Sequence, residues 1–440
     1  MSTNSHLSHS TPFKPGLRTG TSKTLATEER SYIRIPKIDD DFINTHFTSL
    51  TSLSEIVTKI KMDSFIKTSL LELEKGSNED KLYAPLAVVF NKVASSVCGP
   101  EPMVFHPSYD IRPSGESRRE DRLLAPDFSI LPPKLTFTYK DKEGKQRIPW
   151  SALESVIEVK RGKRWDHPQA IDYIETLLQY RPDKVYTFGM SCNQELYQFY
   201  YADACIQKSS PVFRWKDSLD EFIQFVYTLY FNYENDIGRD KSYTLHGVMW
   251  QQQPKAVNAS ARWRVSFDGR TNEVQRIFAR KGKGRRTWLG IGQEINEFST
   301  VTNTPEKDRI RIVKDMWRDT SRRFKESEIL NHIHKDGYIA GVVRHISASP
   351  VSELTVADPI KGDRMKERVV MASTGLRLSA CESVLDFLKV MYDLVETHEQ
   401  LLVKRGVLHR DISWYNVLCK PEHFIGHDKV IEHPTIGKIL

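Results

Sequence analysis

The stretch GVLHRDISWYNVL, residues 406–418, contains side chains that suit phosphoryl transfer. The carboxylate of Asp411 can accept the proton of an attacking hydroxyl group, and the side-chain oxygen of Asn416 can hold a magnesium ion. Both tasks take place beside the same phosphates, so the two residues must lie close together on one loop. The alternative is a chance His-Arg-Asp sequence on a surface loop. The apolar residue before it and the strand-like Asn-Val-Leu after it argue against chance.

The spacing of His409-Arg410-Asp411 and Asn416 is that of a protein-kinase catalytic loop. Upstream of this loop, Arg311-Ile312-Val313-Lys314 resembles the strand whose lysine binds the α- and β-phosphates of ATP. The alternative for Lys314 is a lysine exposed on an ordinary strand.

The helix predicted after this strand, residues 321–334, offers a partner for the lysine. In active kinases a glutamate on this helix forms an ion pair with the strand lysine. Glu326 and Glu328 both qualify. We prefer Glu326 because helical steps of three and four residues place Ile329 and Leu330 on the same inward face. The alternative is an ordinary glutamate in contact with water.

The segment RKGKGRRTWLG, residues 280–290, is a candidate for the loop that covers the phosphates. Gly282 and Gly284 take the first two positions of the Gly-x-Gly-x-x-Gly pattern, whereas Thr287 stands at the third. A solvated basic loop is the alternative. The order along the chain supports a phosphate loop, because glycine-rich turn, lysine strand, glutamate helix and catalytic loop follow one another as in kinases.

A second group of candidate residues lies in the first half of the chain. Asp127 follows a proline, and Glu158 and Lys160 lie on a predicted strand after a hairpin. Because side chains alternate along a strand, Glu158 and Lys160 share one face. The two carboxylates could bind a hard divalent cation, and the lysine could orient the water that the metal activates. The alternative is a solvated strand edge, since short acidic-x-Lys strands are common.

Pro-Asp followed by Glu-x-Lys resembles the site of restriction-endonuclease-like nucleases. Gln169 and Tyr173, on the helix after the strand, resemble a companion element of that fold. Plain polarity of a helix surface is their alternative. The resemblance implies an α/β nuclease-like domain, although a fold does not fix its function. The basic run at residues 160–165 could contact phosphates or form a surface turn, so nucleic acid is a candidate partner of this half.

The chain resembles the fungal-type protein kinases, most specifically at residues 406–418, and the resemblance extends back to the β-rich block that begins near residue 126, so it covers most of the chain after the leader. The resemblance rests on Lys314-Asp315-Met316-Trp317, on a long helix that carries His398, and on His-Arg-Asp-Ile-Ser at residues 409–413. It implies a fungal source and a Ser/Thr-directed transfer of the γ-phosphoryl group of ATP, with ATP and Mg²⁺ as cofactors. The residue roles it implies are Asp411 as the base, Lys314 as the phosphate anchor, Glu326 as its partner, Gly282 and Gly284 in the phosphate loop, and Asn416 as a metal ligand.

The sequence departs from the family after the catalytic loop. There the family continues into Asp-Phe-Asp or Asp-Phe-Gly, whose aspartate binds magnesium, and Ile436–Leu440 resembles the strand that leads to it. Without that aspartate, phosphoryl transfer should fall by orders of magnitude. We therefore expect a fragment, an incomplete gene model or a short pseudokinase. The alternative function is a nuclease-like or nucleic-acid-binding module with a non-catalytic kinase remnant.

The hydrophobic periodicity predicts an α+β protein. We expect a protein-kinase-like fold, with a small lobe and the start of the large lobe, preceded by an α/β restriction-endonuclease-like domain. Residues 1–40 are expected to form a disordered leader, residues 41–245 the first domain, and residues 246–440 the partial kinase-like domain. Near the boundary, residues 246–263 are expected to be a loose polar segment. A long helix is predicted at 383–406.

Composition limits the class of protein further. The net charge of +7 is compatible with phosphate-bearing partners but identifies none. No apolar run reaches the length of a membrane span. The five cysteines lack Cys-x-x-Cys spacing, which argues against a zinc site and a disulfide framework. We expect an intracellular protein, cytoplasmic or nuclear, with an unidentified protein substrate and no membrane partner.

Overall fold

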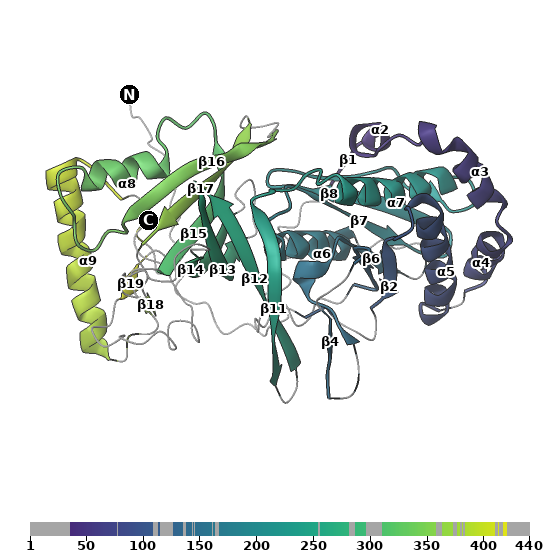
Figure 1. The fold of residues 1–440 in the computed structure, drawn as a ribbon, viewed down its shortest axis with the longest axis horizontal. Coiled ribbons are helices and arrows are strands. Elements are labelled where there is room, and N and C mark those ends of the chain that lie inside the picture. The colour runs from purple at the N-terminus through teal and green to yellow at the C-terminus, as the bar shows by residue number, and fades with distance from the viewer. Residues whose placement is uncertain are drawn as a thin grey trace, which may run out of the picture.

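Two β-sheets stand side by side, with α3 to α5 at one end of the molecule and α9 at the other (Figure 1). The helices are α2 (Phe42–His46), α3 (Ser54–Met62), α4 (Ser64–Glu74), α5 (Asp80–Val97), α6 (His167–Tyr180), α7 (Leu219–Glu234), α8 (Glu326–His334) and α9 (Val384–Arg405), with 3-10 turns at Thr51–Leu53 and Trp150–Ala152. This computed structural model describes residues 36–76, 78–108, 113–114, 126–134, 138–142, 144, 146–160, 162, 167–253, 256–280, 287–295, 310–357, 363–372, 376–378, 381, 383–409, 412 and 417–419. None of the helices in these ranges is long and apolar enough to cross a membrane.

The first sheet is mixed, with the strand order β1-β9-β8-β7-β6-β3-β2 and with β10 paired to β8. Strands β2, β3 and β6 are antiparallel neighbours, whereas β6 and β7 are parallel and are connected through α6. A parallel pair requires such a crossover. The strands are β1 (Lys37–Ile38), β2 (Val104–Pro107), β3 (Phe128–Leu131), β6 (Ser155–Val159), β7 (Thr187–Cys192), β8 (Leu196–Ala202), β9 (Gln207–Ser209) and β10 (Phe213–Arg214), and a separate hairpin pairs β4 (Tyr139–Lys140) with β5 (Gln146–Arg147).

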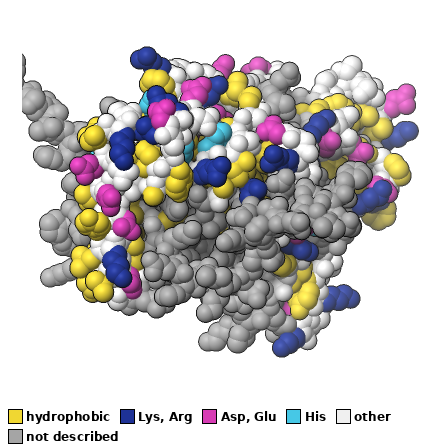
Figure 2. Space-filling model, turned by 60° about the vertical axis from the view of Figure 1, so that its left-hand side comes forward, with side chains coloured by type: hydrophobic (Ala, Val, Ile, Leu, Met, Phe, Trp, Pro, Cys, Tyr) yellow, Lys and Arg dark blue, Asp and Glu magenta, His cyan; other side chains and the backbone are white. Residues whose placement is uncertain are grey.

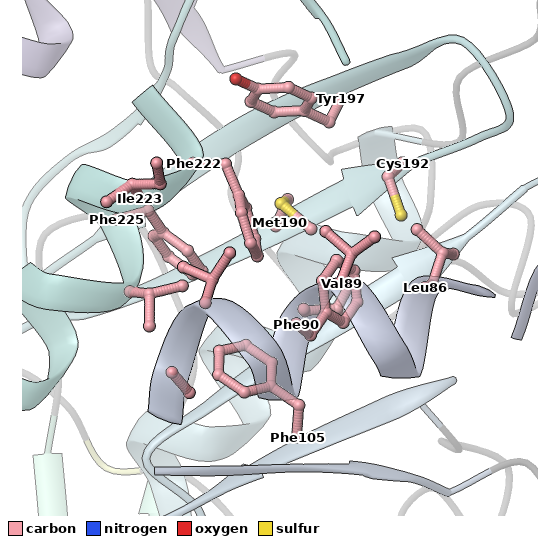
Figure 3. Packing of buried hydrophobic residues seen from close by; sticks show 14 of the residues in the cluster. Leu86, Val89, Phe90, Phe105, Met190, Cys192, Tyr197, Phe222, Ile223 and Phe225 are labelled. Atoms are coloured by element: carbon pink, nitrogen blue, oxygen red, sulfur yellow. The ribbon is translucent and has the colours of Figure 1, made fainter. Parts of the chain in front are cut away.

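Apolar clusters hold helices to both faces of the first sheet. Strand β6 shows the alternation, because Val156 joins the cluster around α6 while Ile157 joins the cluster around α5 and α7. Both side chains are buried. Figure 3 shows the second cluster, where Phe90 of α5 and Phe222 of α7 pack with ring centroids 5.1 Å apart. Burial of each large apolar side chain contributes roughly 1.5–3 kcal/mol, so these clusters determine how the helices cover the sheet.

The second sheet is antiparallel, with the order β11-β12-β13-β14-β15-β17-β16. Its strands are β11 (Tyr243–Gln253), β12 (Ala256–Phe267), β13 (Arg270–Arg280), β14 (Thr287–Ile295), β15 (Ile310–Asp319), β16 (His345–Val356) and β17 (Arg364–Met371). Between β15 and β16, α8 packs on one face through Leu330 and Ile333.

The loose polar segment predicted at 246–263 is wrong, because these residues form most of the β11–β12 hairpin. Along β12, Ala259, Ala261 and Trp263 are buried while the residues between them are only partly buried. This is the period of two that a strand requires, and small alanines make it look polar. The expected domain limit at 245/246 falls inside β11.

Near each end of the described part of the chain, a short strand pairs with another strand. Of the predicted leader, residues 1–35 lie outside the described residues, and Lys37 and Ile38 form β1 on the edge of the first sheet, so that part is not a disordered leader. Near the other end, β18 (Leu376–Arg377) pairs with β19 (Leu418–Cys419). Helix α9 packs inward through Leu394 and Leu401. Figure 2 shows exposed apolar side chains among charged ones over this end of the molecule.

Candidate functional site

An interior strand of the second sheet, β15, carries Lys314. Strand β15 lies between β14 and β17, with Lys314 opposite Leu289 on one side and Val369 on the other. It follows the antiparallel pair of β13 and β14 along the chain. Gly282 and Gly284, between β13 and β14 in the sequence, lie outside the described residues. The hairpin, the lysine strand and the following helix have the order of a kinase small lobe.

Lys314 and Glu326 form a close ion pair. The Nζ atom of Lys314 lies 2.8 Å from each of the two side-chain oxygens of Glu326, the first residue of α8. Lys314 is 9% exposed, so the pair is shielded from bulk water without being sealed from it. Such an arrangement holds an ammonium group at a fixed place above the sheet, where it can meet a phosphate.

Glu328, the other candidate partner of Lys314, caps the start of α8 instead. Its Oε2 atom accepts a hydrogen bond of 3.1 Å from the backbone N–H of Lys325, at the start of α8. This is the reciprocal half of a capping box. The structure therefore pairs Lys314 with Glu326 and not with Glu328. The face argument was correct for Leu330, which is buried, but wrong for Ile329, which is 39% exposed.

The predicted catalytic loop is anchored at both ends. Helix α9 ends at Arg405, where Gly406 adopts a left-handed φ of 63°, and Val407 then packs against the apolar cluster around α8. On the other side Val417 is buried beside α9, and β19 follows. Asp411 and Asn416 lie outside the described residues. The fold thus holds the segments before and after these two residues.

In the first sheet, Asp127, Glu158 and Lys160 come together at the ends of two adjacent strands. Asp127 precedes β3, while Glu158 lies on β6 and is 1% exposed. The Oδ2 atom of Asp127 accepts a hydrogen bond of 2.7 Å from the N–H of Val159. Lys160 Nζ contacts Glu158 Oε1. Both carboxylates are buried, so the alternative of a solvated strand edge is wrong for Glu158.

The charges of this site are incompletely balanced. Burial raises the pKa of Glu158 well above its ordinary range, and the nearby carboxylate of Asp127 raises it further. Burial also raises the pKa of Asp127, although the N–H of Val159 works in the opposite direction. The Oε2 atom of Glu158 is buried and has no hydrogen-bond partner among the described residues. If both carboxyl groups ionise, Lys160 can balance one of the two charges, which leaves a surplus negative charge.

The companion residues lie on the next helix. Gln169 donates a hydrogen bond of 2.6 Å to the hydroxyl group of Tyr173 on the same face of α6. Tyr173 is 1% exposed, so it is a core residue rather than part of a polar surface. In the part of the chain that the structure describes, no group of three or more His, Cys, Asp or Glu side chains is arranged to hold a metal ion. The site offers two carboxylates.

Sequence reasoning missed two members of this site. The hydroxyl group of Tyr83, on α5, lies 2.8 Å from Asp127 Oδ1 and 3.1 Å from Glu79 Oε1. Neither Tyr83 nor Glu79 was among the candidate residues predicted from the sequence. The signal was the separation of Glu79 and Tyr83 by four residues, which places both side chains on one face of a helix.

A strand lysine paired with a helix glutamate, upstream of a His-Arg-Asp loop, defines a protein-kinase-like site. The comparison with protein families agrees: the family model described as Fungal protein kinase matches residues 133–363 and 355–430. The chain belongs to this family. The matched region begins after β3 and runs through both sheets. No curated protein and no solved structure matches the chain.

Proposed function

We propose that this chain carries the site of an ATP-dependent protein kinase that transfers the γ-phosphoryl group to serine or threonine hydroxyl groups. The observation that carries this proposal is the ion pair of Lys314 with Glu326, at 2.8 Å. An ion pair at this place is a feature of active kinases, because it directs the lysine at the α- and β-phosphates. Membership of the fungal protein kinase family supports the same conclusion.

Each residue has a separate task in this proposal. Lys314 holds the phosphates and Glu326 orients it. Asp411 accepts the proton of the substrate hydroxyl group, and Asn416 is the residue that would hold Mg²⁺. When bound, Mg²⁺ neutralises charge on the phosphates. The roles of the residues outside the described ranges rest on their spacing in the sequence, and they are Gly282, Gly284, Asp411 and Asn416.

Nucleotide binding gives the first test. The affinity of the 440-residue chain for a fluorescent ATP analogue with Mg²⁺ should fall about tenfold or more in Lys314→Met, which corresponds to about 1.4 kcal/mol. Lys325→Met is the matched control, because Lys325 is an exposed lysine eleven positions on that pairs with Glu328. Glu326→Gln and Glu328→Gln form a second matched pair. Equal losses in a variant and its control would contradict the proposal.

Phosphoryl transfer gives the second test. The 440 residues contain no Asp-Phe-Gly or Asp-Phe-Asp after the catalytic loop, so transfer of label from γ-labelled ATP to a mixed protein substrate should be orders of magnitude slower than in a kinase with that motif. Acid hydrolysis of the product should release phosphoserine or phosphothreonine. Asp411→Asn should abolish transfer while leaving nucleotide affinity within about twofold, because the base contacts the hydroxyl group rather than the nucleotide. Release of phosphotyrosine alone would overturn the Ser/Thr assignment. Absence of nucleotide binding by the unaltered chain would overturn the kinase proposal.

A second candidate function belongs to the first domain, and one observation favours it. The order helix, three antiparallel strands, helix and parallel strand, formed by α5, β2, β3, β6, α6 and β7, supports a restriction-endonuclease-like fold. Within it, the surplus negative charge at Asp127 and Glu158 is what a divalent cation would balance. We propose a nuclease-like or nucleic-acid-binding module there, with Lys160 beside the site.

Metal binding and DNA cleavage test this candidate separately. Manganese ions should raise the unfolding midpoint of the unaltered chain at pH 8, and Glu158→Ala should remove the increase. Glu195→Ala is the control, because Glu195 is exposed at the turn between β7 and β8. Cleavage of plasmid DNA with Mg²⁺ or Mn²⁺, lost in Glu158→Ala alone, would support a nuclease. A metal effect without cleavage would support a binding module, and neither effect would end this candidate.

A further inference from the structure

A buried group of four charged residues joins the first domain to the second sheet. Asp240 lies between α7 and β11, Asp315 is on β15, and Lys366 and Arg368 are on β17. Their exposed fractions lie between 1% and 4%. The group contains two carboxylates and two cations, so it is neutral as a whole. We call these four residues the junction network.

Arg368 and Lys366 connect the two carboxylates. The guanidinium group of Arg368 binds both oxygens of Asp315, at 2.7 and 2.9 Å, and also lies 3.0 Å from Asp240. Lys366 Nζ lies 2.6 Å from Asp240 and 3.1 Å from Asp315. Lys366 also donates a hydrogen bond of 2.8 Å to the carbonyl group of Pro182. The planar guanidinium group of Arg368 contacts Asp315 at two points, so the pair fixes the direction of the contact as well as its length.

The network bears directly on Lys314, which is the residue before Asp315. Side chains alternate along a strand, so Lys314 points to the α8 face while Asp315 points to the opposite face. Trp317, two residues further, shares the Asp315 face and packs with Val185 and Ala204 of the first domain. The first domain therefore contacts the face of β15 opposite to the face that carries Lys314.

A second contact supports the strand that leads into residues 281–286. The guanidinium group of Arg276, on β13, lies 3.8 Å from the ring centroid of Tyr180 at the end of α6. It also donates a hydrogen bond of 3.3 Å to the carbonyl group of Gln179. Arg276 is 5% exposed. The first domain thus contacts both strands that, in the kinase proposal, approach the phosphates.

We propose that Asp240 of the first domain is a positioning residue for Lys314, acting through Lys366, Arg368 and Asp315. The first domain is then part of the framework of the nucleotide site rather than a separate module attached to it. This inference rests on the proposed kinase function for its consequence, because the value of a fixed Lys314 is the phosphate that it meets. The placement of Lys314 can be measured without nucleotide.

The test compares Asp240→Asn with Glu154→Gln in the 440-residue chain. Glu154 is 4% exposed and binds Arg181, Lys184 and Arg239, all within the first domain. Because these partners of Glu154 lie outside β15 and β17, Glu154→Gln should destabilise the first domain without directly changing either strand. Both variants are studied well below their unfolding midpoints. Asp240→Asn/Lys366→Met, which removes one charge of each sign, replaces Asp240→Asn if that variant does not fold.

The first readout is the rate at which an amine-reactive ester acylates Lys314, measured by mass spectrometry relative to Lys325. We expect an acceleration of about 2- to 30-fold in Asp240→Asn, the range of coupling for residues that contact neither ligand, and no change in Glu154→Gln. The second readout, affinity for the fluorescent ATP analogue, should weaken by a similar factor only in Asp240→Asn.

The outcomes separate the two proposals. Equal acylation of Lys314 in the two variants would overturn the positioning role, whatever the nucleotide affinity. Faster acylation in Asp240→Asn, in a chain that binds no nucleotide even when unaltered, would support the positioning role and overturn the kinase proposal. Faster acylation together with selectively weakened nucleotide binding would support both.

Discussion

The junction network and the Asp127–Glu158 site both bury carboxylates, but they balance the charge differently. In the network, two carboxylates meet two cations, and although burial alone would raise the pKa of Asp315, Arg368 and Lys366 lower it to about 2. In the Asp127–Glu158 site, two carboxylates share Lys160, and the pKa of both carboxyl groups is raised. Complete balance suits a structural joint, whereas a surplus of negative charge suits a site that binds a cation.

Arg368→Met should produce the largest loss of stability and so tests the structural side of this comparison. The change leaves two buried carboxylates with Lys366 alone, and breaking a buried ion pair from one side costs about 3–5 kcal/mol. Urea unfolding would measure it. The control is Lys61→Met, whose exposed pair with Asp220 at 2.6 Å contributes about 0–1 kcal/mol. A loss in Arg368→Met no larger than the control would show that the network is not a joint.

The pH dependence of the two carboxyl groups should have opposite signs. The pKa of Asp315 is lowered on folding, so its stabilising contribution is present above pH 4 and is lost as the pH falls towards about 2. The pKa of Glu158 is raised on folding, so its ionisation weakens the fold as the pH rises above the ordinary glutamate range.

Glu158→Gln tests this sign. The variant should be as stable as the unaltered chain at pH 5 and more stable at pH 8, by about 1–2 kcal/mol in the free energy of unfolding. Unfolding in urea at the two pH values, without divalent cations, measures the difference. Added Mn²⁺ should reduce this advantage at pH 8, because a bound cation stabilises the ionised carboxylate. A variant less stable at pH 8 than at pH 5, relative to the unaltered chain, would contradict the unbalanced charge.

Local patterns in the sequence predicted the elements better than the contacts between them. The helix at 383–406 and the strand around Arg311–Lys314 were evident because a periodic apolar pattern reports directly on burial. The pair of Lys314 with Glu326 was predictable because both lie on adjacent elements in a known order. The hairpin at β11 and β12 was missed because alanine contributes little to an apolar pattern while still fitting a buried strand face.

The junction network was beyond sequence reasoning for a different reason. Asp240 lies 126 positions before Lys366 and 128 before Arg368, and nothing in the local sequence of any of them marks a buried charge. Charged residues are usually exposed, so burial here depends on partners brought from distant strands. Asp315 was noticed only as part of Lys-Asp-x-Trp, and its own contacts show why an aspartate follows the lysine.

Tyr83→Phe should give the smallest effect and sharpens the comparison within the first domain. Loss of the hydroxyl group that contacts Asp127 should cost about 1 kcal/mol. The matched control is Tyr201→Phe, whose hydroxyl group donates a hydrogen bond of 2.9 Å to Asp203. Because the Tyr83 hydroxyl group works to lower the pKa of Asp127, its removal should cost more at pH 8 than at pH 5, while the control should show little such difference. Equal losses in the free energy of unfolding for the two variants at both pH values would contradict the raised pKa of Asp127.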